Sequence, residues 1–276
     1  MTTILLDGRI ISYAIYGDGS PIAPTVFYFH GFPASHHEAS LFDSPARKRG
    51  IRLIAPDRPG MGSSTFTPTR KITDWPADVL QLADDPAINA PTFAVLGTSG
   101  GGPYVLACCA AIPSSRLTTA GIIGGLYPPS LGLAGMLMEP RLLLSIAPRA
   151  PKLVEKVFDW GLVAAARNAD QGKIEKIMAS SMKGRPEPDR RAWDENEDGF
   201  REMLVMAVRG SVQENGGKGP AQGARLLGSP WGFELGDVKM KKGKLVLWHG
   251  GADANIPLTM VEKAHEPLAG SELRVG

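Results

Sequence analysis

The feature that most constrains this chain is an apolar run, Phe93-Ala-Val-Leu96, that leads directly into Gly97-Thr-Ser-Gly-Gly101. A helix-like run, Tyr104–Ala111, follows this motif. Gly-x-Ser-x-Gly between a strand and a helix is typical of a sharp turn that lifts the serine hydroxyl out of the backbone. The two outer glycines leave room where a side chain would collide with the turn. The N-terminus of the helix directs its positive end and free N–H groups toward Ser99. We therefore expect Ser99 to be a positioned nucleophile, provided that a base can take its proton.

Strand-like runs alternate with helix-like runs in the first 126 residues and again near the end of the chain. Two of them, Thr3–Leu6 and Arg9–Tyr16, flank Asp7-Gly8, which predicts a hairpin. The other predicted strands are Thr25–His30, Arg52–Ala55, Thr92–Leu96, Thr118–Ile123, Lys244–Trp248 and Ser271–Val275. Helices are predicted over Thr73–Ala83, Gly100–Ile112 and Leu258–Leu268. This alternation indicates an α/β fold whose mostly parallel sheet has helices on both faces.

The alternation stops between residues 127 and 235, where the sequence shows helices and loops but no convincing strand. Helical patterns are clearest over Lys152–Ala166 and Gly199–Val208. We therefore predict a core made of residues 1–126 and 236–276, interrupted by a helical cap over residues 127–235. A Gly-rich stretch inside this region, Glu214–Pro220, is expected to be a loop. It lacks the glycine spacing and the following Ser or Thr of a phosphate-binding loop.

Charge and composition exclude several classes of partner. The 30 basic and 28 acidic residues give a formal charge of +2, which offers no electrostatic reason to expect nucleic acid or an anionic membrane. No apolar run reaches the ~20 residues of a membrane-spanning helix, and the N-terminus does not resemble a signal peptide. The adjacent Cys108 and Cys109 are expected to be buried packing residues rather than a disulfide or metal site. We expect a cytoplasmic protein without metal or cofactor.

A second motif, Phe29-His30-Gly31-Phe32-Pro33, follows the predicted strand Thr25–His30. The loop after this strand is where the second donor of an oxyanion hole should lie. The N–H of Phe32 would then face the N–H of Gly100. Together these two groups would hold the negative oxygen of a tetrahedral intermediate, and one such donor is typically worth ~3–4 kcal/mol of activation free energy.

These residues make the chain resemble the α/β-hydrolase superfamily, in particular its bacterial and fungal branch of serine hydrolases with a helical cap. The matching motifs are His30-Gly-Phe-Pro33, Asp57-Arg-Pro-Gly-Met-Gly-Ser63, Gly97-Thr-Ser-Gly-Gly101 and Trp248-His-Gly-Gly-Ala-Asp-Ala-Asn-Ile-Pro257. The resemblance implies that Ser99 is the nucleophile, that Asp253 is the triad acid, and that Phe32 and Gly100 are the oxyanion donors. Asp253 also lies just past a predicted strand end, where open α/β sheets place their sites. The implied substrate is a small molecule with an ester, lactone or related acyl bond. A serine at the turn argues against the relatives that use an aspartate there.

The general base is missing from this pattern. The order in this architecture is Ser, Asp, His, and only His265 follows Asp253. His265 falls in a predicted helix before the last strand, whereas the family's histidine lies in a loop after it. We therefore expect that the sequence ends before the catalytic histidine or has lost it.

Two functions stay open: a serine hydrolase, and a non-catalytic hydrolase-like binding protein. A dinucleotide-binding enzyme fits poorly, because Gly100-Gly-Gly-Pro103 does not match the required glycine spacing.

Overall fold

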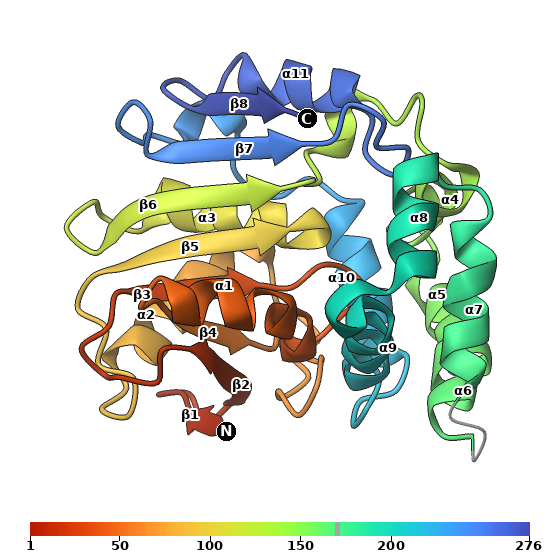
Figure 1. Cartoon of the computed structure of the whole chain (residues 1–276), viewed down its shortest axis with the longest axis horizontal. Coiled ribbons are helices and arrows are strands. Elements are labelled where there is room, and N and C mark those ends of the chain that lie inside the picture. Colours follow the sequence, from red (N-terminus) through yellow and green to blue (C-terminus); the bar gives the residue numbers. More distant parts are fainter. Residues whose placement is uncertain (169–171) are drawn as a thin grey trace.

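An eight-stranded sheet forms the centre of the molecule in the computed structural model, which describes residues 1–168 and 172–276 (Figure 1). The strand order is β1-β2-β4-β3-β5-β6-β7-β8. The strands are β1 (Thr2–Ile4), β2 (Ile10–Gly17), β3 (Thr25–Phe29), β4 (Arg52–Pro56), β5 (Phe93–Thr98), β6 (Leu117–Ile123), β7 (Leu245–His249) and β8 (Glu272–Val275). The pairs β1–β2 and β2–β4 are antiparallel, and the remaining neighbours are parallel. The predicted hairpin and the predicted mostly parallel sheet are confirmed.

Helices cover both faces of the sheet. Successive side chains of a strand point to opposite sides, so both faces carry apolar side chains that must be buried. Phe27 and Phe29 of β3 belong to the large core cluster, whereas Tyr28 belongs to a second, smaller cluster. The large cluster includes residues of α2 (Trp75–Asp84), α3 (Gly102–Ala111) and α11 (Leu258–His265). The smaller cluster includes Ala46 of α1 (Asp43–Lys48), which packs on β2 and β4. The α/β fold predicted from the sequence is therefore the fold observed.

Between β6 and β7 the chain forms a layer of helices beyond the carboxyl ends of the strands (Figure 1). These helices are α4 (Met138–Ile146), α5 (Pro151–Phe158), α6 (Ala164–Ala166), α7 (Lys173–Met182), α8 (Glu187–Glu195), α9 (Phe200–Ser211) and α10 (Lys218–Leu227). A π-type segment, η5 (Asp159–Val163), joins α5 to α6. The 3-10 helices are η1 (His36–Phe42), η2 (Ile72–Asp74), η3 (Ser99–Gly101), η4 (Pro129–Leu131), η6 (Glu197–Gly199) and η7 (Leu235–Asp237). As expected, the described residues between 127 and 235 contain no strand.

Several predicted elements end a few residues away from the observed ones, such as the helix predicted over Leu258–Leu268, which ends at His265. A larger difference is that α10 begins at Lys218, inside the loop expected over Glu214–Pro220. Pro220 is compatible with this start, since a proline in the first helical turn removes no intrahelical hydrogen bond. Gly219 has a packing role: a Cβ added to it would lie 1.9 Å from the carbonyl oxygen of Gly60. The glycines that suggested a flexible loop therefore allow helix α10 to approach the segment after β4.

The two cysteines are buried in α3 and form no disulfide. Burial raises the pKa of the Cys109 thiol to about 12, so it is protonated at neutral pH. This agrees with the packing role predicted for both residues. Across residues 1–168 and 172–276, no helix has the length and apolar character needed to cross a bilayer.

The contact between Gly60 and Gly219 predicts a stability effect. We expect Gly219→Ala to lower the free energy of unfolding by about 1–3 kcal/mol, because the new methyl group overlaps backbone that cannot rotate away. Gly236→Ala is the matched control, since a Cβ there meets no atom within 4 Å, and its effect is expected within about 0.5 kcal/mol. Urea unfolding measures both variants, and equal midpoints would contradict this account of the contact.

Candidate active site

Ser99 lies at the turn between β5 and α3 in a left-handed backbone conformation, with φ at +50°. The residues two positions before and after it must be glycines for this turn to form. A Cβ on Gly97 would lie 2.7 Å from Val105 Cγ2, and one on Gly101 would lie 2.1 Å from the carbonyl oxygen of Phe29. The side chain of Ser99 is partly exposed, and its hydroxyl forms no hydrogen bond with a described residue. The serine is therefore held at the carboxyl edge of the sheet with a free hydroxyl.

The backbone of Phe32 lies beside that of Gly100, as the sequence predicts for a pair of oxyanion donors. A Cβ added to Gly100 would lie 2.7 Å from Phe32 Cβ and 3.4 Å from the Phe32 nitrogen. Gly100 is in the first turn of η3, where N–H groups have no intrahelical acceptor. The N–H of Phe32 donates to no acceptor within residues 1–168 and 172–276. Two unused N–H donors therefore lie close together next to Ser99.

A buried hydrogen-bond chain connects the loop after β3 to the residue before Ser99. Glu38 Oε2 accepts a hydrogen bond of 2.6 Å from the N–H of Gly31 and one of 2.8 Å from the hydroxyl of Tyr28. Tyr28 Oη also lies 2.9 Å from Thr98 Oγ1. Because the single proton of Tyr28 serves the carboxylate, Thr98 is the donor in this last contact. The chain fixes the position of Gly31 relative to Thr98, which precedes Ser99.

Arg58 holds the same loop from another side. Its guanidinium donates to the carbonyl oxygens of His30 and Gly31 at 2.5 and 2.7 Å. The group also lies over the ring of Tyr104 in α3, 4.7 Å from the centroid. Arg58 is 1% exposed, and burial lowers its pKa to about 10, so it stays charged at neutral pH. The guanidinium therefore links the loop that carries Phe32 to the helix that follows Ser99.

Asp253 lies in the turn after β7 with one carboxylate oxygen fixed. Its Oδ1 accepts hydrogen bonds from the N–H groups of Asn255 and Ile256 at 2.8 and 3.0 Å. Its Oδ2 lies 3.8 Å from His249 Nε2, but that nitrogen is hydrogen-bonded to the carbonyl oxygen of Ile256 at 2.8 Å. One oxygen of Asp253 is therefore held by the backbone, and the other accepts no hydrogen bond from a described residue.

The segment after β6 lies between Asp253 and Ser99. A Cβ on Gly124 would lie 3.6 Å from Asp253 Oδ2, and the N–H of Leu126 donates to the carbonyl oxygen of Ser99 at 3.0 Å. Strands β5 and β7 are the two neighbours of β6 in the sheet. The structure thus brings Ser99, Gly100, Phe32 and Asp253 to one edge of the sheet.

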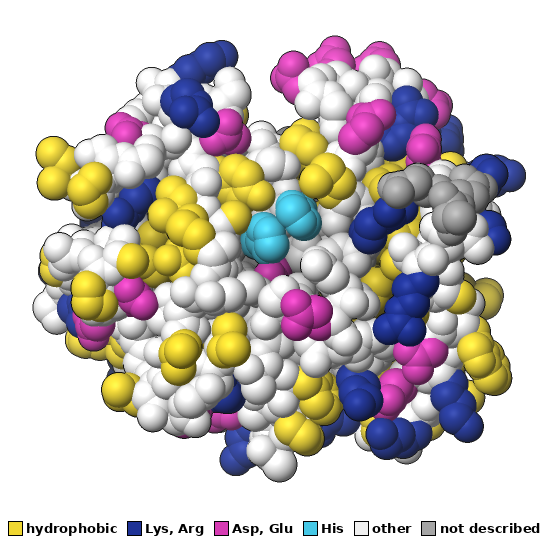
Figure 2. Space-filling model, turned by 90° about the horizontal axis from the view of Figure 1, so that it is seen from below, with side chains coloured by type: hydrophobic (Ala, Val, Ile, Leu, Met, Phe, Trp, Pro, Cys, Tyr) yellow, Lys and Arg dark blue, Asp and Glu magenta, His cyan; other side chains and the backbone are white. Residues whose placement is uncertain are grey.

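Two histidines form a separate group on η1. His36 Nδ1 lies 2.6 Å from Oδ2 of the fully buried Asp57, and the N–H of His36 donates to Oδ1 at 2.6 Å. The rings of His36 and His37 lie 4.2 Å apart, and Figure 2 shows a pair of histidine rings in contact at the surface. No local sequence pattern predicts the pairing of His36 with Asp57, because the two residues are 21 positions apart.

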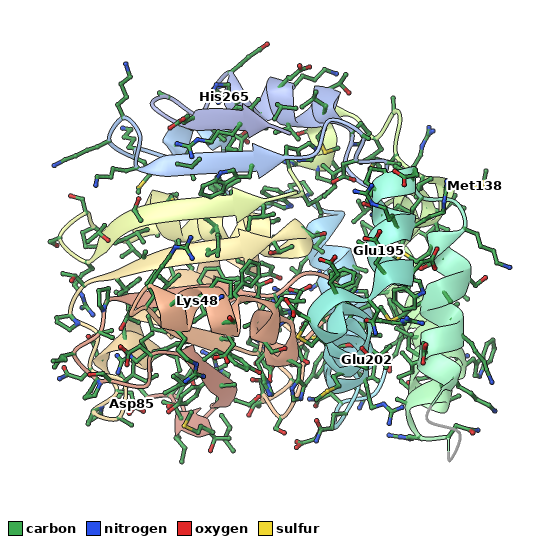
Figure 3. All side chains as sticks on the ribbon, viewed as in Figure 1. Lys48, Asp85, Met138, Glu195, Glu202 and His265 are labelled. Atoms are coloured by element: carbon green, nitrogen blue, oxygen red, sulfur yellow. The ribbon has the colours of Figure 1, made fainter. Side chains whose placement is uncertain are left out.

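The other three histidines also have hydrogen-bond partners other than Ser99. His30 is buried beside Arg58, and His249 is turned toward Ile256. His265 Nδ1 lies 2.8 Å from the hydroxyl of Ser271, which directly precedes β8, so it is at the amino edge of the sheet. Figure 3 places His265 at this end of β8, opposite the carboxyl edge that carries Ser99. No histidine of the described chain forms a hydrogen bond with the Ser99 hydroxyl.

The buried Glu38 predicts a pH effect on stability. Burial raises the pKa of Glu38 in the folded state, so its favourable contribution is present at low pH and is lost as the pH rises through the folded pKa. Glu38→Gln keeps an oxygen acceptor for Gly31 and Tyr28 but cannot ionise. We expect the stability difference between the variant and the wild type to shift in favour of the variant as the pH rises from about 4.5 toward neutrality. Urea unfolding at several pH values measures this difference, and a constant difference would contradict it.

Comparisons with known proteins agree with this architecture. The model of the Alpha/beta hydrolase family matches residues 26–274. An esterase from Exiguobacterium antarcticum superposes with a TM-score of 0.64 at 20% identity, covering 100% of this chain and 90% of the esterase. A bromoperoxidase from Bacillus anthracis gives 0.67 at 18% identity, with coverage of 100% and 90%. The enol-lactonase from Burkholderia xenovorans LB400 gives 0.65 at 17% identity, with coverage of 100% and 91%.

Identities this low show that the fold is shared and do not transfer a substrate. A search of curated proteins finds no match. The family match, in contrast, covers most of the sequence and includes Phe32, Ser99, Gly100 and Asp253. The chain belongs to the alpha/beta hydrolase family.

Proposed function

We propose that the protein is a serine hydrolase acting on a carboxylic ester, a lactone or a related acyl bond of a small molecule. The observation that carries this proposal is the left-handed Ser99 beside the unused N–H donors of Phe32 and Gly100. Donors in these positions suit the charge that develops when a hydroxyl adds to a carbonyl group. The hydrolase family and the esterase and enol-lactonase folds support the same class of chemistry.

In the proposed reaction, Ser99 Oγ forms a bond to the carbonyl carbon and gives its proton to a base. The carbonyl oxygen becomes an oxyanion held by the N–H groups of Phe32 and Gly100. The intermediate then expels the alcohol, which takes the proton back from the base, and leaves an acyl-enzyme. Water attacks this ester in the same way and releases the acid. Asp253 would orient an imidazole base and stabilise its protonated form through its free oxygen.

We propose that residues 127–235 act as the cap of this site. Phe158 of α5 packs edge-on against Phe32, with ring centroids 6.2 Å apart. Leu227 of α10 approaches Gly100, since a Cβ there would lie 3.4 Å from Leu227 Cδ1. Side chains from these helices therefore border the proposed oxyanion donors, where they would contact the acyl group or the alcohol of a substrate.

A non-catalytic binding protein is the second candidate, because no histidine of the described residues is hydrogen-bonded to Ser99. Without a base, a serine hydroxyl stays protonated and is a weak nucleophile. Loss of the base from a comparable triad lowers kcat by on the order of 10⁶. The two candidates therefore differ in whether the site turns over an ester once an imidazole is supplied.

Added imidazole tests this point. We expect the chain to hydrolyse p-nitrophenyl acetate faster in its presence, because a free imidazole can bind to Asp253 and take the proton of Ser99. Ser99→Ala should abolish the protein-dependent part of the rate, Asp253→Asn should abolish the imidazole effect, and Ser44→Ala, at an exposed position, should change neither. The hydrolase proposal fails if wild type and Ser99→Ala show equal rates at every imidazole concentration, which is the result that the binding-protein candidate predicts.

Arg58→Lys tests the proposed role of the loop. Lysine keeps the charge but lacks the planar pair of nitrogens with which the guanidinium reaches the carbonyl oxygens of His30 and Gly31, so the N–H of Phe32 is expected to move. We expect imidazole-supported turnover to fall by up to about 10²–10³, the effect of removing one oxyanion donor. Arg70→Lys is the matched control, because Arg70 is also buried, at 4% exposed, and its side chain is hydrogen-bonded to Tyr104 and Gln222. If turnover falls by the same factor in Arg58→Lys and Arg70→Lys, general destabilisation explains the result, and the proposed role of Arg58 in holding the loop is contradicted.

A further inference from the structure

The strand β8 forms one end of the sheet, and no strand of the described residues pairs with its outer edge (Figure 1). Gly276, directly after β8, donates its N–H to the carbonyl oxygen of His249, and its own carbonyl oxygen accepts the N–H of Gly251. The main-chain groups of successive residues point to opposite sides of a strand. Those of Leu273 and Val275 therefore point away from the sheet, at its open edge.

The side chains along this edge alternate in charge. Glu272 and Arg274 are two positions apart, so both side chains lie on the same face of the sheet. They are 48% and 54% exposed, and Arg274 Nε lies 2.8 Å from Glu272 Oε1. The guanidinium also lies over the ring of Trp248 in β7, 5.8 Å from its centroid. The open edge of β8 thus presents one anion and one cation side by side.

We propose that β8 pairs antiparallel with β8 of a second copy of the chain, so that the two sheets join across a two-fold axis. In an antiparallel pair, residues whose main-chain groups point toward the partner lie opposite each other and exchange hydrogen bonds. Here these residues are Leu273 and Val275. A two-fold pairing that keeps most of β8 in contact is therefore centred on Leu273 or on Arg274.

Charge selects one of these two registers. A pairing centred on Arg274 brings the guanidinium groups of the two copies opposite each other, and like charges in this position destabilise a strand pair. A pairing centred on Leu273 instead places Glu272 of each copy opposite Arg274 of the other. These positions lie between the hydrogen-bonded pairs, where opposed Cα atoms are only about 4.5 Å apart. Each carboxylate then lies between two guanidinium groups.

The register centred on Leu273 also uses main-chain groups of the open edge. The two copies of Leu273 lie opposite each other and exchange N–H···O hydrogen bonds. The N–H of Val275 faces the carbonyl oxygen of Ser271 of the second copy, whereas the N–H of Ser271 is already donated to Leu268. Main-chain hydrogen bonds therefore provide the affinity, and the charged side chains fix the register.

A second copy suits this edge better than an unrelated strand, because the charge order of β8 is its own antiparallel complement. Two-fold dimers are also the commonest oligomers of soluble proteins. Glu272–Val275 contains neither the lysine nor the proline that often protects an edge strand from pairing. The proposal does not depend on the hydrolase proposal, since β6 and β7 lie between β8 and the strand that leads to Ser99.

Sedimentation equilibrium of the full chain at increasing concentration tests the pairing, and we expect a monomer–dimer equilibrium. Glu272→Arg and Arg274→Glu each place like charges opposite each other at both symmetry-related positions. Each variant alone should raise the dimer Kd about tenfold, which corresponds to about 1.4 kcal/mol. A mixture of the two variants restores opposite charges at both positions, so it should form a heterodimer about as tight as the wild-type dimer.

Arg191→Glu is the matched control, because Arg191 is also exposed and also lies beside a glutamate, 3.8 Å from Glu195, but on α8. It should leave the dimer Kd unchanged, and circular dichroism checks that all variants fold. The proposal is overturned if the wild type stays monomeric, or if both charge variants dimerise like the wild type. It is also overturned if the mixture of the two variants associates no better than either variant alone.

Discussion

The close approach of two glycine-bearing turns at the ends of β3 and β5 determines the arrangement of the whole site. Gly101 has no side chain, so the carbonyl oxygen of Phe29 occupies the position that a Cβ would take. The next residues along each segment are thereby brought together, with Ser99 and Gly100 on one side and Phe32 on the other. A single methyl group at Gly101 would separate them. Parallel pairing of β3 with β5 sets the direction in which both segments leave the sheet.

Buried charges then hold this arrangement in place. Glu38 and Arg58 are both removed from water. Arg58 donates hydrogen bonds to the carbonyl oxygens of His30 and Gly31, and Glu38 accepts one from the N–H of Gly31. Desolvating two such groups is costly, and the cost is offset only when their donors and acceptors find partners. Arg58 is satisfied by carbonyl oxygens and by the face of Tyr104, while Glu38 receives two hydrogen bonds on one oxygen. The rigidity of the loop thus comes from polar contacts rather than from apolar packing alone.

The sequence was sufficient to predict the parts of the structure that depend on local pattern. Runs of apolar residues gave the strands, and the glycine spacing around Ser99 gave the turn, because both are read from neighbours in the chain. Glu38 and Arg58 were not found in this way. Their roles depend on contacts with Gly31 and Tyr104 across the fold, and nothing nearby in the sequence marks them as buried. The loop predicted over Glu214–Pro220 was wrong from Lys218 onward, where α10 begins, for a related reason. Gly219 in the first turn of this helix allows close contact with Gly60, which lies far away in the sequence. The roles proposed for Ser99, Asp253, Phe32 and Gly100, and the cap over residues 127–235, stay predictions.

The backbone of Ser99 bears on the choice between a hydrolase and a binding protein. A left-handed conformation costs a residue with a side chain roughly 1–2 kcal/mol, whereas glycine adopts it freely. The turn between β5 and α3 would therefore be more stable with glycine at this position, and three glycines already surround it. A ligand-binding site gains little from a strained serine whose hydroxyl forms no hydrogen bond. A hydrolase, in contrast, needs an oxygen at this point, beside the N–H groups of Phe32 and Gly100, and strain of this kind is typical of functional sites. The conformation of Ser99 therefore favours chemistry at the carboxyl edge of the sheet over binding alone.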